Sequence, residues 1–230
     1  MSEILKINNL WGGYQEGVDI LRGISMEVQQ GEAVGIIGLN GSGKSTFGKA
    51  IMNMIPIRKG EILFEGEDIT ALSTSELSHR GFSIMQQGGK VFRNLSVWDN
   101  LQLAGQGRSA QLAEIIPLLQ KPKSQLQHLM ADKLSGGQKH QLSLAMTLAT
   151  NPRLVILDEP SAGLSPKSVE EMYQMLRSIK ENIRVTIILI EQNIAKAVRF
   201  CNESYLLGQG VIKSEIFNEI TTIKNIMFNK

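Results

Sequence analysis

The chain of 230 residues lacks three features that would each define a class of protein: paired cysteines, a long apolar run and an excess of one charge. Its single cysteine, Cys201, excludes a disulfide within the chain and a cysteine-rich zinc site, and we expect it to be a small buried side chain. The longest apolar runs, AVGIIGL at 33–39 and VTIILI at 185–190, are far shorter than the roughly 20 residues that span a bilayer. We therefore expect no membrane-spanning helix.

Charge and composition further limit the class of protein, its partners and its location. Lysine and arginine number 24 and aspartate and glutamate 22, a net charge of +2 with no block of like charge, so nucleic acid is not expected as a partner. The first ten residues, MSEILKINNL, lack the apolar core of a signal peptide, and we expect a cytoplasmic protein. A chain of this length with 42% hydrophobic residues can form one sizeable domain with an appended subdomain.

The pattern of hydrophobic residues predicts an α/β fold with a mostly parallel central sheet. Three nearly continuous apolar runs, AVGIIG, LVILDE and VTIILI, are typical of strands covered on both faces, and we place them at the centre of the sheet. The first 30 residues instead half-alternate between glycines, which predicts a small N-terminal antiparallel β-layer. Near the other end, ESYLLGQGVIKSE predicts two strands that turn at 208–210, followed by a final helix.

Between residues 88 and 133 the strand pattern gives way to short helices. The segments LSVWDNLQLAG, AQLAEIIPLLQ and SQLQHLM are separated by glycines and prolines, which are common helix boundaries. We interpret 88–133 as an inserted helical subdomain, and residues 1–87 with 134–230 as the core that carries the chemistry.

The segment GLNGSGKST at 38–46 matches the phosphate-loop pattern G-x-x-x-x-G-K-[S/T] in full, between an apolar strand and a helical stretch. Glycines let successive N–H groups face a phosphate, and the N-terminus of the following helix adds a positive dipole end. We expect Lys44 to reach the β- and γ-phosphates of a nucleotide and Ser45 to bind Mg²⁺. The expected phosphate-binding residues are Gly38, Leu39, Asn40, Gly41, Ser42, Gly43, Lys44, Ser45 and Thr46.

Asp158 and Glu159 end the apolar strand in RLVILDEP. Ligands of open α/β sheets bind beyond the carboxyl ends of the strands, so both carboxylates are candidates for nucleotide chemistry. Taken alone, two acids before a proline could equally cap the next helix. The phosphate loop earlier in the chain favours the chemical interpretation.

LSGGQ at 134–138 lies between the phosphate loop and this acidic strand end. Its serine and glycines could simply cap the helix that follows. An exposed helix N-terminus with a serine hydroxyl is also a good clamp for a γ-phosphate. The three motifs in this order resemble those of the ATP-binding cassette (ABC) proteins, and the resemblance covers nearly the whole chain.

This resemblance implies a P-loop NTPase core that hydrolyses Mg-ATP in a dimer, in which LSGGQ of one subunit covers the ATP held by the other. It implies that Ser135, Gly136, Gly137 and Gln138 bind the partner's nucleotide and that Ser45, Gln87 and Asp158 hold Mg²⁺. The implied catalytic residues are Glu159 as general base, with Lys44, Gln87 and Gln192. Gln86 is an alternative to Gln87, because both follow the strand in IMQQGG.

An aromatic ring ahead of the phosphate loop usually stacks on adenine in this family. Trp11 and Tyr14 in NNLWGGYQEG are both candidates. We choose Tyr14 because it is closer to the expected place, although either ring could simply pack on the β-layer.

Two positions depart from the common family pattern. Gln192 stands after VTIILI, where most ABC proteins have a histidine; glutamine can donate a hydrogen bond but cannot take a proton. Ser165 in SAGLSP stands where many relatives have aspartate. Both features, with VFRNLSVWDNL, resemble the ATPase subunits of branched-chain amino acid importers. His79, His128 and His140 lack metal-ligand spacing, so we expect solvated or packing roles for them.

The expected protein is therefore the ATPase subunit of an importer for a hydrophobic amino acid or similar solute, peripheral on the inner face of the cell membrane. Its partners would be a second copy or a paralogous ATPase, permease subunits that contact 88–133, and a separate solute-binding protein. Two alternatives stay open. One is the ATPase of a lipid-exporting system, and the other is a non-transport ABC module, whose relatives usually have paired cassettes or long heptad insertions.

Overall fold

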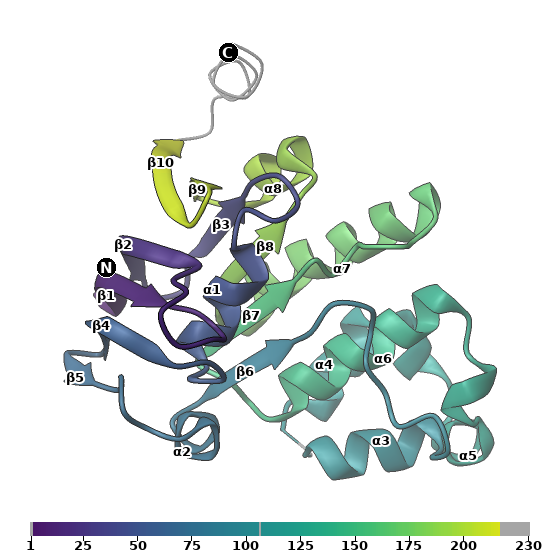
Figure 1. Ribbon diagram of the computed structural model, residues 1–230. Helices are drawn as coiled ribbons and strands as arrows, with labels where there is room; N and C mark the ends of the chain where they lie inside the picture. Colours follow the sequence, from purple (N-terminus) through teal and green to yellow (C-terminus); the bar gives the residue numbers. More distant parts are fainter. Residues whose placement is uncertain (1, 106, 217–230) are drawn as a thin grey trace. The chain divides into compact units, whose positions relative to one another are not determined.

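The computed structural model describes residues 2–105 and 107–216 and divides the chain into two compact units. The first unit comprises Met1–Arg80 and Thr186–Lys230, and the second comprises Gly81–Val185. Both units combine strands with helices (Figure 1), which confirms the predicted α/β class. No helix in the described ranges is long and apolar enough to cross a membrane.

An antiparallel sheet in the first unit has the strand order β2-β1-β4-β5. β1 (Glu3–Gly12) lies between β2 (Leu21–Gln29) and β4 (Ile57–Phe64), and β5 (Glu67–Asp68) pairs with β4. Burial alternates along β2, as expected for a sheet with one face on the core. The antiparallel layer predicted from the first 30 residues is confirmed, but β4 and β5 join it from beyond the phosphate loop.

Parallel strands form the other sheet region of the first unit. β3 (Ala33–Ile37) lies between β8 (Thr186–Glu191) and β9 (Glu203–Gly208) and is parallel to both. Every residue of β3 and β8 is buried, as their continuous apolar runs predicted. β10 (Val211–Ile216) returns antiparallel to β9 across the predicted turn at 208–210, and the expected final helix lies outside the described residues. The described residues of this unit contain the helices α1 (Lys44–Ile51), α2 (Thr74–His79) and α8 (Ile194–Phe200).

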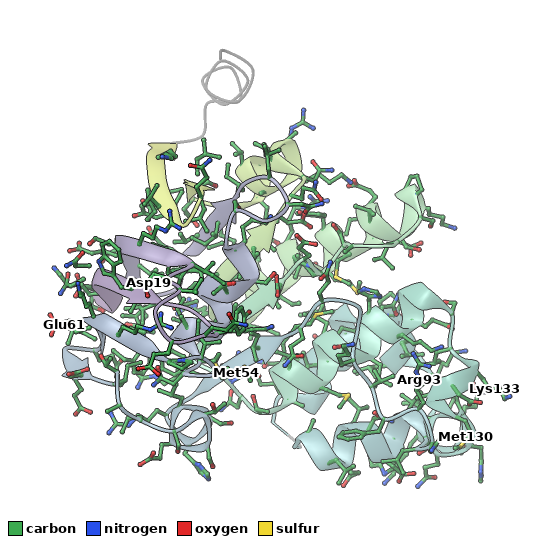
Figure 2. The ribbon with its side chains drawn as sticks, viewed as in Figure 1. Asp19, Met54, Glu61, Arg93, Met130 and Lys133 are labelled. Atoms are coloured by element: carbon green, nitrogen blue, oxygen red, sulfur yellow. The ribbon has the colours of Figure 1, made fainter. Side chains whose placement is uncertain are left out.

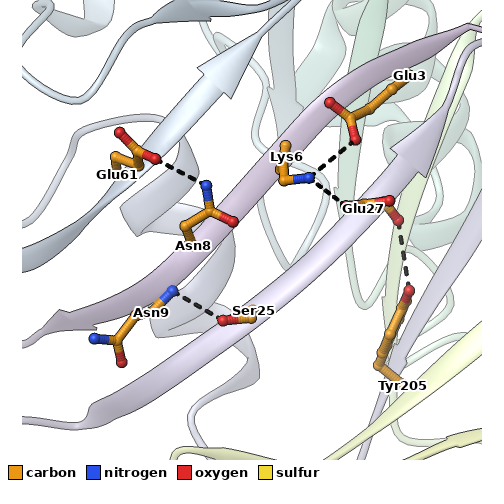
Figure 3. Close-up of polar contacts among 8 residues, drawn as sticks. All are labelled: Glu3, Lys6, Asn8, Asn9, Ser25, Glu27, Glu61 and Tyr205. Carbon is orange, nitrogen blue, oxygen red and sulfur yellow. Dashed lines mark hydrogen bonds and ion pairs between the residues drawn. The ribbon is translucent and has the colours of Figure 1, made fainter.

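Polar pairs cross neighbouring strands on the face of the antiparallel sheet shown in Figure 3. Lys6 on β1 donates to Glu27 on β2 at 2.5 Å, and this bond raises the pKa of the Lys6 ammonium. Asn8 on β1 donates to Glu61 on β4 at 2.8 Å. Both pairs stand directly opposite each other in the ladder, so they favour this register. Tyr205 on β9 donates its hydroxyl to the carbonyl oxygen of Glu27 at 3.5 Å.

The second unit is mostly helical around one parallel strand pair, β6 (Phe82–Met85) and β7 (Leu154–Asp158). Its helices are α3 (Val97–Ala104), α4 (Ser109–Ile115), α5 (Lys123–His128), α6 (Gly136–Ala149) and α7 (Pro166–Ile183), with 3₁₀ turns at Pro117–Gln120 and Ala131–Lys133. The helices predicted between residues 88 and 133 are therefore present.

A buried asparagine holds the loop that precedes α3. The amide oxygen of Asn100 accepts from the N–H of Phe92 at 2.8 Å. Its amide nitrogen donates to the carbonyl oxygens of Phe92 and Ser96 at 3.0 and 2.9 Å. The N–H of Phe92 has its acceptor in this side chain, and the two carbonyl oxygens, which also accept from the backbone N–H groups of Leu95 and Asn100, gain a second donor. Asn100 therefore anchors the loop from inside the unit.

We predict that Asn100→Ala lowers the free energy of unfolding by about 2–4 kcal/mol, because it removes the hydrogen bonds of a fully buried side chain, takes the acceptor from the N–H of Phe92 and opens a small cavity. Asn182→Ala is the matched control: Asn182 on α7 donates to the Ser178 carbonyl at 2.8 Å, but in an exposed position. The control should change the unfolding free energy by less than about 0.5 kcal/mol. Urea unfolding followed by circular dichroism measures both variants, and equal losses would contradict the anchoring role of Asn100.

Candidate functional site

The phosphate loop, residues 38–46, connects β3 to α1 in the first unit. Gly41 and Gly43 have φ of +77° and +103°, which other residues rarely adopt, so these glycines allow the tight curl. Lys44 is the first residue of α1, and its ammonium donates to the carbonyl oxygens of Gly38 and Leu39, both at 3.0 Å. The loop thus holds a buried positive charge within its own curl.

The polar groups of this loop fit an anion. The hydroxyl oxygen of Ser42 is buried and has no hydrogen-bond partner among the described residues. By helix geometry, the N–H groups in the first turn of α1 have no acceptor within the helix, and the helix dipole adds positive potential there. Together with the Lys44 ammonium they form a donor set suited to phosphate. Ser45 is half-buried and Thr46 buried, so Ser45 is the more accessible hydroxyl for a metal ion.

The C-terminal hairpin braces the phosphate loop. The N–H of Gly210, in the turn between β9 and β10, donates to the carbonyl oxygen of Ser42 at 2.9 Å, and its own carbonyl accepts from the N–H of Arg22 at 2.8 Å. A Cβ at Gly210 would lie 1.8 Å from the carbonyl oxygen of Ile20, and φ here is +78°. The GQG pattern predicted a turn, but nothing in it indicated what the turn contacts.

Tyr14 and Trp11 differ in their availability to an adenine ring. Tyr14 is 50% exposed, and the ammonium of Lys49 on α1 lies 5.3 Å from its ring centroid. Trp11 is half-buried within β1, and its indole N–H donates to Asn9 at 3.0 Å. Tyr14 is therefore the more accessible ring, and it lies beside the helix that follows the phosphate loop.

Gln192 lies in an exposed turn after β8. The buried carboxylate of Glu191 accepts from the N–H of Gln192 at 2.9 Å and from the N–H of Asn193 at 3.1 Å. Asn193 in turn caps α8. Glu191 thus fixes the backbone that presents Gln192. Motif patterns missed this residue, although a carboxylate directly after the apolar run VTIILI was a signal that could have found it.

The two acids lie at the carboxyl end of β7 in the second unit. Asp158 is buried, whereas Glu159 is half-buried with φ of +47°. The amide nitrogen of Gln87 donates to the Glu159 carboxylate at 2.7 Å. Of the two glutamines that follow β6, Gln87 is therefore the one whose amide reaches the acidic strand end.

The hypothesis that these acids cap the next helix is wrong. α7 begins after Ser165, whose hydroxyl accepts from the N–H of Ser168 at 3.3 Å, and Pro166 occupies its first position. Asp158 and Glu159 take no part in starting this helix. Ser165 therefore has a structural role at the place where many relatives have aspartate.

LSGGQ forms the N-terminus of α6. The hydroxyl of Ser135 accepts from the N–H of Gln138 at 3.3 Å, and the amide oxygen of Gln138 accepts from the N–H of Ser135 at 3.0 Å. Ser135 and Gly136 are exposed, and a Cβ at Gly136 would meet nothing within 4 Å. The capping and the anion-binding interpretations therefore describe the same open helix end.

The predicted site residues are distributed over both units. Tyr14, residues 38–46 and Gln192 belong to the first unit, and Gln87, residues 135–138, Asp158 and Glu159 belong to the second. Within the units, Lys44 contacts its own loop and Gln87 contacts Glu159. Each unit therefore carries part of the predicted chemistry.

Comparison with known proteins identifies the family. Residues 21–162 match the family model described as ABC transporter, and the chain belongs to this family. It is 30% identical over 204 residues to the high-affinity branched-chain amino acid transport ATP-binding protein BraG of Pseudomonas aeruginosa, a match that covers 86% of this chain and 87% of that protein. It is 31% identical over 212 residues to the lipopolysaccharide export system ATP-binding protein LptB of Escherichia coli, covering 90% of this chain and 87% of LptB.

A solved structure shares the fold over almost the full length. A nucleotide-free ATP-binding cassette from an ABC transporter has a TM-score of 0.83 and 26% identity, and the match covers 98% of this chain and 95% of that one. The predicted cassette fold is confirmed, and the chain is an ABC ATPase. Such ATPases dimerise and pair with membrane permease components.

We predict that Gly210→Ala weakens ATP binding roughly tenfold, about 1.4 kcal/mol, because its Cβ pushes the turn away from Ile20 and disturbs the bond to Ser42. Gly66→Ala is the matched control, since φ at Gly66 is +82° but a Cβ there would meet nothing within 4 Å. Titration with a fluorescent ATP analogue compares the two. If Gly66→Ala weakens binding as much, backbone strain and not the brace is responsible.

Proposed function

We propose that this chain is the ATP-hydrolysing subunit of an ABC importer for a branched-chain or other hydrophobic amino acid, or a similar solute. The bond from Gln87 to Glu159 carries the hydrolytic part of the proposal, because it joins an amide and a carboxylate at the end of β7. Import is supported by the sequence IEQN at 190–193, with glutamine in place of a histidine, and by the similarity to BraG.

ATP with Mg²⁺ supplies the phosphoryl group that is transferred and the charge that neutralises its oxygens. The protein's own side chains bind and orient the ATP. Ser42, Lys44 and the N–H groups of the loop hold the phosphate oxygens, and Tyr14 stacks on adenine. Ser45, Gln87 and Asp158 would hold the metal ion.

Glu159 takes the proton of the attacking water as general base. The hydrogen bond that Gln87 donates orients the carboxylate of Glu159. Gln192 donates a hydrogen bond to the γ-phosphate but cannot take a proton, so Glu159 is the only base in this mechanism. Phosphoryl transfer suits such a site, because it needs positioning and charge stabilisation more than covalent help from the protein.

The LSGGQ segment serves a second copy or a paralogous ATPase. Ser135 and Gly136 are exposed at the N-terminus of α6 in a single copy, so with Gly137 and Gln138 they can bind the nucleotide of a partner. Two Mg-ATP then lie between phosphate loops and opposed LSGGQ segments in a head-to-tail dimer. A single copy binds ATP but hydrolyses it poorly.

Residues 88–133 face the permease, and residues 1–87 with 134–230 form the ATP-binding catalytic core. Large apolar side chains of this helical segment are exposed: Phe92 at 55%, Leu103 at 64% and Met130 at 38%. Figure 2 shows Arg93, Met130 and Lys133 at the same edge of the second unit. Apolar side chains rimmed by charge suit a protein partner. Bound there, the chain lies on the cytoplasmic face of the membrane, and a separate solute-binding protein delivers the solute.

The ATPase of a lipid-exporting system is the second candidate, because LptB is similar to this chain to the same degree as BraG. The distinguishing position is Gln192, which favours the importer. The helical segment and the phosphate loop fit either system.

We predict that Glu159→Gln retains ATP binding but lowers turnover by about 10²- to 10⁴-fold, the usual contribution of a general base. Glu170→Gln is the matched control, since Glu170 is an exposed carboxylate on α7 that pairs with Arg177 at 3.2 Å. Its turnover should stay within about twofold of the wild type. Phosphate release and ATP binding are measured on the same preparations, and near-normal turnover in Glu159→Gln would reject Glu159 as the base.

Cells from which this chain has been deleted test the transport assignment. We expect uptake of radiolabelled leucine, isoleucine or valine to fall, and to return with the wild-type chain but not with Glu159→Gln. Delivery of lipid to the cell surface is measured in the same cells. Normal amino acid uptake with lost lipid delivery would assign the chain to export.

A further inference from the structure

His140 differs from the other two histidines because it is buried, in α6 of the second unit. Its Nδ1 lies 2.9 Å from the carbonyl oxygen of Gly136, one turn earlier at the N-terminus of the same helix. A carbonyl oxygen only accepts, so Nδ1 is the donor in this contact. Nε2 is buried and has no hydrogen-bond partner among the described residues.

Gly89, two residues after Gln87, lies against this ring. Its φ is +59°, and a Cβ there would lie 3.0 Å from Nδ1 of His140 and 3.2 Å from its Cα and Cγ. The lack of a side chain at Gly89 therefore lets the loop after Gln87 approach α6 this closely. The imidazole ring is the surface on which this loop rests.

Further contacts extend from both sides of this pair, all within the second unit. On the loop side, Gln87 donates to Glu159 at 2.7 Å. On the helix side, Gly136 follows Ser135, whose hydroxyl caps α6. His140 thus stands between the loop that reaches the acidic strand end and the helix end that carries LSGGQ.

Packing alone does not account for a histidine at this position. Leucine has a similar volume and would fill the space without a buried ring nitrogen left unpaired, which is unfavourable. Leucine cannot donate to the Gly136 carbonyl. The N–H group at the δ position is therefore the property that distinguishes histidine here.

We propose that His140 is a positioning residue that couples the two ATP sites of the dimer, because it ties the loop that carries Gln87 to the helix end that carries Ser135. This inference rests on the proposed roles of Gln87 at its own copy's nucleotide and of Ser135 at the partner's. A shift of the loop at one site moves the ring, and the ring moves the helix end that contacts the other nucleotide. Hydrolysis by the dimer is cooperative in ATP for this reason.

Two replacements separate the donor from the bulk of the ring. His140→Leu keeps the volume and removes the donor, whereas His140→Asn keeps an N–H group at the place of Nδ1. The wild-type dimer should hydrolyse ATP with a Hill coefficient above 1 and up to about 2. We expect His140→Leu to lower this coefficient to about 1, with the ATP affinity of the single copy unchanged. His140→Asn should retain the cooperativity. His79→Leu is the matched control, because Nδ1 of His79 makes the same contact with the Ser75 carbonyl at 2.7 Å in an exposed position.

The contact with Gly89 gives an independent measurement. Gly89→Ala places a methyl group against Nδ1 and should also lower the Hill coefficient. If both residues act through one contact, the double variant Gly89→Ala with His140→Leu should lose no more turnover than the more impaired of the two single variants. Additive losses would overturn the proposal, and this comparison remains decisive if His140→Asn does not fold.

Two further outcomes would overturn the coupling role: retained cooperativity in His140→Leu, or a loss in His140→Asn as large as in His140→Leu. Urea unfolding of each variant establishes that the native fold is present. The proposed function has its own readout in the same assays. If Gln87→Ala and Ser135→Arg leave hydrolysis unchanged, the roles of Gln87 and Ser135 are wrong, whatever the His140 variants do.

Discussion

Close backbone approach through glycine is the constraint on which both halves of the candidate site depend. In the first unit, the turn at Gly210 reaches Ser42 of the phosphate loop only because no Cβ stands in the way. In the second unit, Gly89 lies directly on the ring of His140. The buried strands supply the rigid layers, while these contacts determine where the binding loops lie on them.

Continuous motifs could be predicted from the sequence, because their geometry is decided by neighbouring residues. The curl at 38–46, the capped helix end at Ser135 and the strand end at Asp158 each consist of consecutive residues with strong local preferences. The strands β3 and β8 were equally clear, since continuous apolar runs demand burial on both faces. From sequence alone, Asp158 and Glu159 could either take part in nucleotide chemistry or cap the next helix. The structure excludes capping, because Ser165 is the N-cap of α7.

Contacts between distant segments could not be predicted in this way. No pattern in the chain relates Gly210 to Ser42, or Gly89 to His140, because such pairs meet only once the strands have assembled. Glu191 belongs to an intermediate class: its place after an apolar run was visible, but its bonds to the turn at Gln192 follow from the end of β8. The same reason explains why β4 and β5 were missing from the predicted antiparallel layer.

The capping box at Ser135 has a consequence for the assembly of the proposed dimer. Its two hydrogen bonds form inside one copy, so the helix end has its shape before a nucleotide or a partner arrives. Ordering side chains during association costs on the order of 0.5–1.5 kcal/mol for each one immobilised. Here the side chains of Ser135 and Gln138 are ordered when each copy folds, so their loss of conformational entropy does not oppose dimer formation. In the proposed dimer, closure then joins helix ends whose local shape is already set in each copy, and the nucleotide determines the equilibrium between open and closed pairs.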